Sequence, residues 1–356
     1  RWLETLTAEQ IAAGDEVVVA TGQVQGDEVE DPGAGSMPLV RLRRLGRAVS
    51  PLDDVWATRE LRELIGDLKP DVVNTHTAKA GLVGRAAALS LGRNRPALVH
   101  TVHGHLLTGY FSPLAVRGIS TSERLMASAS DLVLAAGEKV RDDLVSAGIV
   151  GADKVRVVRP GVRDFDRIDA AAARVQLGAP ALRSGAVVAG WLARVVRVKR
   201  PDRLVGAALR TPEVEYLVGG DGVLREGLDQ RAPANLHSLG WADPATFWSA
   251  VDLAVLTSDN EAMPYSLVEA GLAGLAAVTT NAGSAAEVVV DGVTGLVVDK
   301  DPGAVAEGVR ALVADAPLRQ RMGEAARARA LVEFSPERML GEHRSAYEEA
   351  LSRQHS

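Results

Sequence analysis

The stretch that most constrains this chain is an apolar run followed directly by a polar loop and a helical pattern. Residues 251–257 (VDLAVLT) have the composition of a strand buried in a parallel sheet. A helix is predicted to begin at about Pro264, because proline in a first helical turn lacks an N–H group that would have no partner there anyway. Open α/β sheets bind ligands where a strand leads into a loop and a helix N-terminus. The stretch therefore predicts an α/β domain with a ligand site close to residue 260.

Two glutamates flank the start of this helix. Glu261 precedes it and Glu269 lies inside it, so both carboxylates are expected to reach one crevice from different depths. The N–H groups around Met263, Tyr265 and Ser266 lie at the positive end of the helix dipole, where phosphate groups or sugar hydroxyls bind well. The alternative is an ordinary pair of surface acids, since spacing alone gives false matches. The strand and helix around the two glutamates favour a binding role.

Size and composition limit the class of protein. A chain of 356 residues is too long for one typical core, so we expect two domains. Its 47% apolar and 24% charged residues are those of a soluble globular protein, and a net charge of −6 does not suggest a nucleic-acid partner. The chain has no cysteine, which excludes disulfides and thiolate chemistry and is consistent with a reducing cytoplasm. No apolar run is long enough to span a membrane, and we expect no signal peptide.

Strand and helix patterns alternate along the chain with one interruption. Pro160-Gly161 ends the first series, and residues 163–184 are charged and alanine-rich with no clear strand. A last helix is predicted from about Pro336, after Phe334-Ser335. We therefore predict an N-terminal Rossmann-like domain, a linker, a second α/β domain and a C-terminal helix that crosses back to the first domain: residues 1–165, 166–184, 185–335 and 336–356.

The N-terminal segment is unusual for an α/β domain. Residues 1–13 have apolar positions at helical spacing, and residues 16–21 form a strand pattern. Because α/β domains rarely begin on such a helix, we expect a first strand and its loop to be missing here. Residues 22–36 are polar and glycine-rich, which predicts a flexible loop. A small basic group follows, and we favour a solvated strand end over a patch that faces an anionic acceptor or membrane: Arg41, Arg43, Arg44 and Arg47.

Three histidines follow a predicted strand over residues 97–102. His100, His103 and His105 suggest a metal site, but their spacing suits neither a helix face nor a zinc pattern, and no cysteine completes a ligand set. The strand would carry His103 to the carboxyl end of the sheet, where it could contact a ligand as a hydrogen-bond partner or proton carrier. The alternative is a histidine that is satisfied within the structure.

Two cations follow a predicted strand of the second domain. Arg194 and Lys199 lie in the loop after residues 186–190 and could neutralise a diphosphate, Arg through its planar fork and Lys as a point charge. Exposed Arg and Lys are common, so the local signal is modest. The glycine-rich turn Gly219–Gly222 adds weak support.

The order of these motifs resembles the retaining glycosyltransferases of family 4, and the resemblance covers almost the whole chain. This family has the α/β GT-B fold, in which two Rossmann-like, doubly wound parallel-sheet domains face a central cleft. Two segments look like acceptor-domain signatures of bacterial members that build capsule, exopolysaccharide or lipid-linked glycans: Thr75–Gly81 with Gly84-Arg85, and His100–Gly104. Three others are similar to donor-domain signatures: Gly190 through Arg194 to Lys199-Arg200-Pro201, Gly219–Gly222, and the pair Glu261 and Glu269.

The resemblance implies a role for each position. Arg194 and Lys199 would hold the donor diphosphate and stabilise the leaving nucleotide without a metal cofactor. Glu269 would bind the ribose hydroxyls, and His103 would lie by the donor sugar. Glu261 would grip that sugar together with the segment Met263, Pro264, Tyr265 and Ser266.

The implied enzyme is a glycosyltransferase of hexosyltransferase type. It would keep the anomeric configuration by front-face displacement, relying on electrostatic stabilisation and positioning. The implied donor is a nucleotide diphosphate sugar, with UDP favoured, and the acceptor a hydroxyl of a glycan or lipid-linked glycan in cell-surface polysaccharide synthesis. The protein would be cytoplasmic, with peripheral contact at the inner face of the membrane through the N-terminal domain.

Some features depart from the family pattern. The first strand and its glycine-rich loop are absent, Ala136 replaces a common serine, and Ala262 stands where glycine is frequent. Asp164-Phe165-Asp166 and Asp299-Lys300-Asp301 match the Asp-x-Asp of metal-dependent glycosyltransferases, although they fall in a linker and a surface turn. A nucleotide-sugar epimerase of GT-B architecture and an inactive nucleotide-sugar-binding protein are alternatives.

Overall fold

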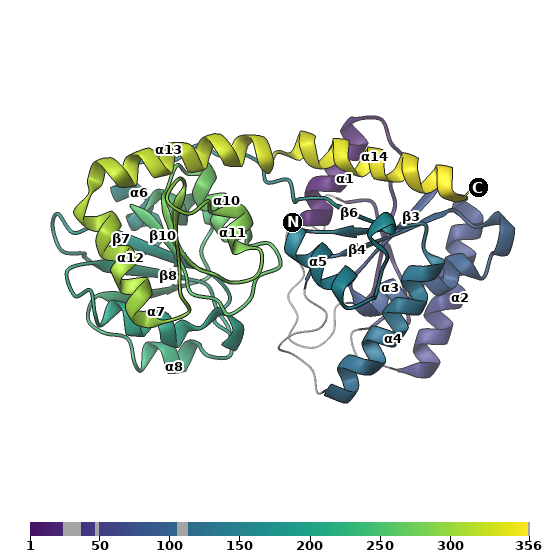
Figure 1. Cartoon of the computed structure of the whole chain (residues 1–356), viewed down its shortest axis with the longest axis horizontal. Helices are drawn as coiled ribbons and strands as arrows, with labels where there is room; N and C mark the ends of the chain where they lie inside the picture. The colour runs from purple at the N-terminus through teal and green to yellow at the C-terminus, as the bar shows by residue number, and fades with distance from the viewer. Residues whose placement is uncertain (24–36, 47–49, 105–112, 355–356) are drawn as a thin grey trace. The chain divides into compact units, whose positions relative to one another are not determined.

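The computed structural model describes residues 1–23, 37–46, 50–104 and 113–354 (Figure 1). Most of the predicted glycine-rich loop, together with Arg47 and His105, lies outside these ranges. The chain divides into two compact units. Unit 1 comprises Arg1–Gly161 with Pro336–Ser356, and unit 2 comprises Val162–Ser335.

Unit 1 is built on a parallel sheet with the strand order β3-β4-β5-β6. Strands β4 and β5 are buried at every position, as expected for central strands with helices on both faces. β1 and β2 pair in parallel with each other in a separate two-stranded sheet. The strands are β1 (Val19–Thr21), β2 (Leu39–Arg41), β3 (Val72–His76), β4 (Ala97–Val102), β5 (Leu132–Ala135) and β6 (Val155–Val157).

Unit 1 includes a helix from each end of the chain, α1 and α14. The C-terminal helix α14 lies beside α1 (Figure 1), and Arg344 of α14 forms an ion pair with Asp15 at 3.0 Å. Tyr347 of α14 accepts a hydrogen bond at 3.0 Å from Asn74 of β3. The helices are α1 (Trp2–Ala12), α2 (Pro51–Leu68), α3 (Ala78–Leu89), α4 (Pro113–Ala129), α5 (Glu138–Ser146) and α14 (Pro336–Gln354).

Unit 2 contains a six-stranded parallel sheet in the order β12-β11-β10-β7-β8-β9. The strand order therefore reverses between β7 and β10, which is the arrangement of a doubly wound nucleotide-binding sheet. In such a sheet, ligands bind beyond the carboxyl ends of the two strands at the reversal. The strands are β7 (Val188–Leu192), β8 (Glu215–Gly219), β9 (Leu236–Gly240), β10 (Leu253–Leu256), β11 (Ala277–Thr280) and β12 (Gly295–Val298).

Unit 2 begins earlier than the sequence analysis predicted, because part of the expected linker is folded against it. Residues 170–176 form α6, capped by the Asp169 carboxylate, and Arg174 Nε donates to Ala250 O at 2.8 Å. The alanine-rich composition of this helix concealed it from the sequence pattern. The other helices are α7 (Pro201–Ala208), α8 (Arg225–Asp229), α9 (Pro244–Ser249), α10 (Tyr265–Leu272), α11 (Ala285–Val288), α12 (Pro302–Ala314) and α13 (Ala316–Glu333).

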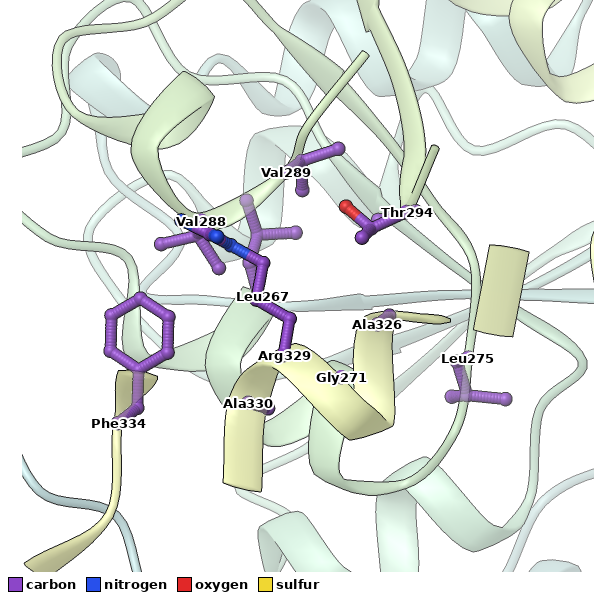
Figure 2. A pocket seen from close by; sticks show the side chains of 11 residues that line it. Leu267, Gly271, Leu275, Val288, Val289, Thr294, Ala326, Arg329, Ala330 and Phe334 are labelled. Atoms are coloured by element: carbon purple, nitrogen blue, oxygen red, sulfur yellow. The ribbon is translucent and has the colours of Figure 1, made fainter. Parts of the chain in front are cut away.

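A small apolar pocket lies between α10, α11 and α13 (Figure 2). Arg329 lines it, and its Nη2 donates to Glu287 O at 2.9 Å. None of the predicted site residues lines this pocket, so we interpret it as a packing feature of the helices that cover the sheet.

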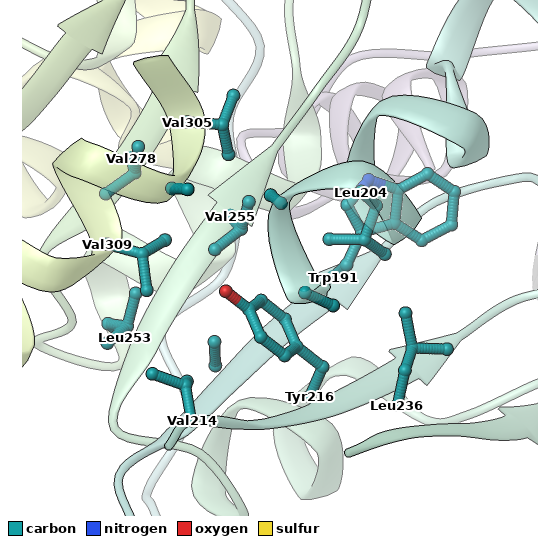
Figure 3. Packing of buried hydrophobic residues seen from close by; sticks show 14 of the residues in the cluster. Trp191, Leu204, Val214, Tyr216, Leu236, Leu253, Val255, Val278, Val305 and Val309 are labelled. Carbon is teal, nitrogen blue, oxygen red and sulfur yellow. The ribbon is translucent and has the colours of Figure 1, made fainter. Parts of the chain in front are cut away.

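The core of unit 2 is formed by side chains from the sheet and from the helices above it. Figure 3 shows Trp191 and Tyr216 from β7 and β8 beside Leu204 of α7. All three are fully buried. This packing fixes the ends of β7 and β10, from which the site loops extend.

The chain leaves and re-enters unit 1 through neighbouring residues. Val162 N donates to Phe334 O at 2.8 Å within unit 2. A Cβ on Gly161 would lie 2.7 Å from Pro336 Cα, so only glycine fits at this junction of unit 1.

Candidate functional site

The candidate site lies at the reversal of strand order in unit 2, in the loops that follow β7 and β10. After β10 the chain passes through Thr257 and Ser258, both fully buried, before α10 begins at Tyr265. Pro264 is the N-cap of α10 and not a residue of its first turn, so the predicted helix start was one residue early. The reason is that Pro264 has extended backbone and its carbonyl accepts the first helical N–H, from Leu267 at 3.0 Å.

The two loops bring together Lys199 and Glu261. Lys199 ends a short 3₁₀ helix over Arg197–Lys199, and its Nζ lies 2.5 and 2.8 Å from the two carboxylate oxygens of Glu261. Ser258 Oγ also donates to Glu261 at 2.5 Å. The lysine is 17% exposed and the glutamate 7%, so the pair is largely shielded from water. A shielded ion pair at the carboxyl end of the sheet places one cation and one anion where a polar ligand would bind.

Arg194 lies in the same loop as Lys199, directly beyond β7. It is exposed, and no side-chain partner of its guanidinium is found among the residues that the structure describes. An arginine in this position keeps its planar fork available for an anion.

The remaining predicted residues of unit 2 lie on or beside α10. Glu269 is buried within the helix, and Met263 is buried just before it. Tyr265 and Ser266 form the first turn and are partly exposed. The first turn of a helix has N–H groups without intrahelical acceptors, so this end of α10 is suited to a polar or anionic group.

A third loop, which sequence reasoning missed, closes on the backbone of Glu261. It follows β11, and Ser284 N donates to Glu261 O at 2.8 Å. Gly283 has φ +55°, and a Cβ there would lie 2.2 Å from Glu261 O. Only glycine permits this approach. A glycine shortly after a predicted strand was the available signal.

His103 lies in unit 1, just beyond β4, and is paired with His76. His76 Nδ1 and His103 Nε2 are 2.7 Å apart, so one ring donates and the other accepts. Trp2 packs edge-on against His103 with ring centroids 4.8 Å apart. Burial and the nearby His343 lower the pKa of His103 to about 4, and burial and His103 hold the pKa of His76 well below its usual value. Both rings are therefore neutral at pH 7 and form a hydrogen-bonding pair.

His100 has a different environment from His103. Its Nδ1 lies 2.8 Å from Thr75 Oγ1, and its Nε2 lies 3.9 Å from the carboxylate of Glu123, which is held by the buried Arg85 at 2.8 Å. Among the described residues, no group of three or more His, Asp or Glu side chains is arranged to hold a metal ion. His100 thus belongs to a buried polar network of unit 1.

The acidic motifs noted in the sequence make structural contacts. Asp164 forms an ion pair with Arg327 at 2.9 Å, within unit 2. Asp301 caps α12, accepting from Gly303 N at 2.7 Å. These contacts account for one aspartate of each motif.

Comparisons with known proteins agree with this arrangement. Residues 1–164 match the family described as Glycosyltransferase Family 4, and residues 179–329 match Glycosyl transferases group 1. The chain belongs to glycosyltransferase family 4. Both the predicted family and the predicted GT-B class of two parallel-sheet α/β domains are confirmed. This family 4 member is a glycosyltransferase that uses a nucleotide-sugar donor.

Several known proteins are similar to most of this chain. The D-inositol 3-phosphate glycosyltransferase of Xylanimonas cellulosilytica is 32% identical over 286 residues, which cover 72% of this chain and 67% of that protein. The capsular polysaccharide biosynthesis glycosyltransferase CapM of Staphylococcus aureus is 24% identical, over 85% of this chain and 82% of CapM. The crystal structure of Anabaena HepE with UDP-glucose superposes with a TM-score of 0.77 at 21% identity, covering 96% of this chain and 93% of HepE.

None of the helices in the described part of this family 4 chain is both long and apolar enough to traverse a bilayer.

Proposed function

We propose that this family 4 enzyme transfers a hexose from a UDP-sugar to a hydroxyl of a glycan or lipid-linked acceptor, retaining the anomeric configuration and requiring no metal. The proposed reaction belongs to cell-surface polysaccharide synthesis. The observation that carries the proposal is the Lys199–Glu261 pair at the reversal of strand order in unit 2. Two relatives support its details, since CapM acts in capsular polysaccharide biosynthesis and HepE was solved with UDP-glucose.

The proposed site supplies positive charge where the leaving nucleotide gains negative charge. Arg194 contributes an exposed fork and Lys199 a point charge, so both can stabilise the departing diphosphate. Because Lys199 is held by Glu261 in the structure, the donor phosphate must draw the lysine at least partly away from the carboxylate. That exchange releases Glu261 to accept hydrogen bonds from hydroxyls of the transferred sugar.

The rest of the site positions the donor. Glu269 would accept from the ribose hydroxyls, and the segment from Met263 through Pro264 and Tyr265 to Ser266 would present backbone groups to the sugar. In this mechanism no side chain attacks the sugar. The acceptor hydroxyl replaces the nucleotide on the same face of the anomeric carbon, and its proton passes to the leaving phosphate.

His103 would act from the acceptor-binding unit as a neutral hydrogen-bond partner of the donor sugar. Its depressed pKa, about 4, supports a neutral ring across the physiological range. His76 occupies one ring nitrogen of His103, and within the described residues no hydrogen bond engages the other nitrogen, which would face the ligand.

We also propose that unit 1 contacts the inner face of the membrane through the start of α2. Leu52, Val55 and Trp56 project from one face of this helix and are 79%, 68% and 53% exposed. Arg44 lies beside them, paired with Asp53 at 3.0 Å, and Arg59 lies over the Trp56 ring. Exposed tryptophan and aliphatic side chains next to arginines are typical of surfaces that enter the lipid interface.

Co-sedimentation with vesicles tests this surface. The triple variant Leu52→Ser, Val55→Ser, Trp56→Ser should bind vesicles of mixed neutral and anionic lipid several-fold more weakly than the native chain. The matched control changes three exposed apolar residues elsewhere: Val175→Ser, Val223→Ser and Val332→Ser. Equal binding by both variants would mean that the membrane contact lies elsewhere.

The reaction is tested with a panel of UDP- and GDP-sugars, with and without EDTA, on the native chain and Glu261→Ala. We expect nucleotide release with one UDP-sugar, unaffected by EDTA and lost in the variant. An NMR spectrum of the product should show the anomeric configuration of the donor. Release that requires a divalent ion, or an inverted product, contradicts the proposal. UDP binding without transfer to any acceptor favours the inactive binding protein.

A further inference from the structure

The loops that carry Lys199 and Glu261 are joined by contacts that do not involve the Lys199–Glu261 pair. We refer to residues 193–200 as the lysine loop and residues 257–264 as the glutamate loop. Their backbones meet where Asp259 N donates to Val198 O at 2.8 Å. The two proposed donor-binding residues are therefore anchored to each other before any donor is present.

Thr257 makes a second connection, at the foot of the glutamate loop. Its Oγ1 donates to Lys199 O at 2.9 Å and accepts from Trp191 Nε1 at 3.0 Å. Thr257 and Trp191 are fully buried. This connection fixes the backbone of the lysine itself to the core of unit 2.

Arg203 makes the third connection and is only 2% exposed. Its Nη1 donates to the main-chain carbonyl of Thr257, and its Nη2 donates to Asp259 Oδ1 at 2.8 Å. Its Nε is buried without a partner among the residues that the structure describes. Burying a guanidinium is costly unless it is well paired. At this position the planar guanidinium of Arg203 reaches both Thr257, directly after β10, and Asp259 in the glutamate loop.

Arg200 completes the connection from the lysine loop. This residue has a left-handed backbone, φ 53°, and its Nη1 donates to Asp259 Oδ1 at 3.1 Å. The same guanidinium also pairs with Asp202 at 2.7 Å, on α7. The Asp259 carboxylate thus accepts hydrogen bonds from Arg200 and from Arg203. Asp202 pairs with Arg200 but does not contact the glutamate loop in these interactions.

We propose that Arg203 and Asp259 are positioning residues that hold Lys199 and Glu261 at the spacing needed for transfer. The inference rests on the proposed function of those two residues. Neither Arg203 nor Asp259 touches the donor in this scheme. They limit how far the Lys199 ammonium group and the Glu261 carboxylate move apart when the donor phosphate draws the lysine toward itself. This limit matters because small displacements of reacting groups cost much of the rate.

The test compares Asp259→Asn with Asp202→Asn. Both substitutions remove one negatively charged partner of Arg200, but only Asp259→Asn weakens the ion pairs that join Arg200 and Arg203 to the glutamate loop. Asp259 is 43% exposed, so its variant should fold, whereas Arg203→Met would take the Arg203 donor away from the buried carbonyl of Thr257. Amide hydrogen exchange is measured in the peptides that cover both loops, together with kcat, KM and the Kd of UDP.

We expect Asp259→Asn to speed exchange in both loops and to lower kcat by about tenfold or more. The Kd of UDP should change by less than about threefold, because the charge of Lys199 remains. Asp202→Asn should match the native chain within about twofold, and Asp259→Glu should restore part of kcat by retaining the carboxylate. An Asp259→Asn variant with native kcat overturns the proposal. A variant that loses thermal stability without faster exchange in the two loops also overturns it.

Failure of the proposed function has a different signature. If the native chain shows no transfer with any donor, amide hydrogen exchange still decides whether Asp259 holds the lysine loop and the glutamate loop together. Equal exchange in Asp259→Asn and Asp202→Asn then overturns the connection itself.

Discussion

At the scale of single residues, the Lys199–Glu261 pair sets up a competition. In the structure each charge neutralises the other at 2.5 Å, so a donor diphosphate bound at Lys199, as proposed, would compete with the carboxylate for one ammonium group. Glu261→Gln removes the competitor and leaves Lys199 free. We predict that the affinity of this variant for UDP is between that of the native chain and a value about tenfold higher. The rate of sugar transfer should fall by on the order of 100-fold.

Calorimetric titration with UDP and a transfer assay measure the two effects separately. The control is Glu213→Gln, which changes an exposed glutamate of unit 2 that lies 3.9 Å from Arg310. Weaker UDP binding in Glu261→Gln would show that Glu261 contributes to nucleotide binding itself.

The buried histidines predict an acid sensitivity of unit 1. Burial lowers the pKa of both His103 and His343 to about 4, below the value of about 6.5 of an unfolded chain. Between pH 6.5 and about 4 the unfolded state therefore binds more protons, so stability is complete above pH 6.5 and falls as the pH decreases. Each histidine contributes a slope of up to about 1.4 kcal/mol per pH unit.

Thermal unfolding at pH 7.5, 6 and 5 follows this loss. His343→Leu should unfold with a smaller decrease between pH 7.5 and pH 5 than the native chain. His237→Gln, in unit 2, should leave the pH dependence of unit 1 unchanged. An unfolding temperature of unit 1 that does not depend on pH in this range would contradict the interpretation.

At the scale of elements, α3 approaches the sheet of unit 1 through glycine. A Cβ on Gly81 would lie 2.5 Å from His100 Cε1, and His100 is buried and held by Thr75 at 2.8 Å. Gly81→Ala should therefore cost about 1–3 kcal/mol of unfolding free energy. A Cβ on Gly66 of α2 would have no neighbour within 4 Å, so Gly66→Ala should stabilise by about 0.5–1 kcal/mol. Urea unfolding of the two variants gives opposite signs if this packing is correct.

The elements were largely predictable from sequence because parallel strands leave continuous apolar runs. The same pattern located Lys199 and Glu261, which lie in the loops that follow β7 and β10. Arg203 could not be found in this way, since its role depends on carbonyls that are distant in sequence. A charged residue inside the buried stripe of α7 was the only signal. The pairing of His76 with His103 depends on the register that places His76 beside Thr101, which no local pattern specifies.

At the scale of the whole molecule, the last helix belongs to the first unit. Ala346 is buried in α14 on the face that also carries Met339, His343 and Ala350. Ala346→Asp buries a charge and should lower the unfolding temperature of unit 1 by roughly 10 °C or more, while that of unit 2 stays unchanged. Ser345→Asp, on the exposed face of the same helix, is the control. Scanning calorimetry separates the outcomes, and a shift in unit 2 would show that α14 stabilises it instead.

The hydrogen bond between Val162 and Phe334 has a consequence for protein engineering. The first residue of unit 2 is hydrogen-bonded to Phe334, which precedes the last residue of the unit, so unit 2 can be exchanged as one segment with two neighbouring junctions. A chimera that replaces residues 162–335 with the corresponding segment of another family member needs only these two junctions to match. Gly161 and Pro336 should be kept in every such graft, because their close contact leaves no room for a side chain. Such a chimera would exchange the proposed donor site while unit 1 keeps its own residues.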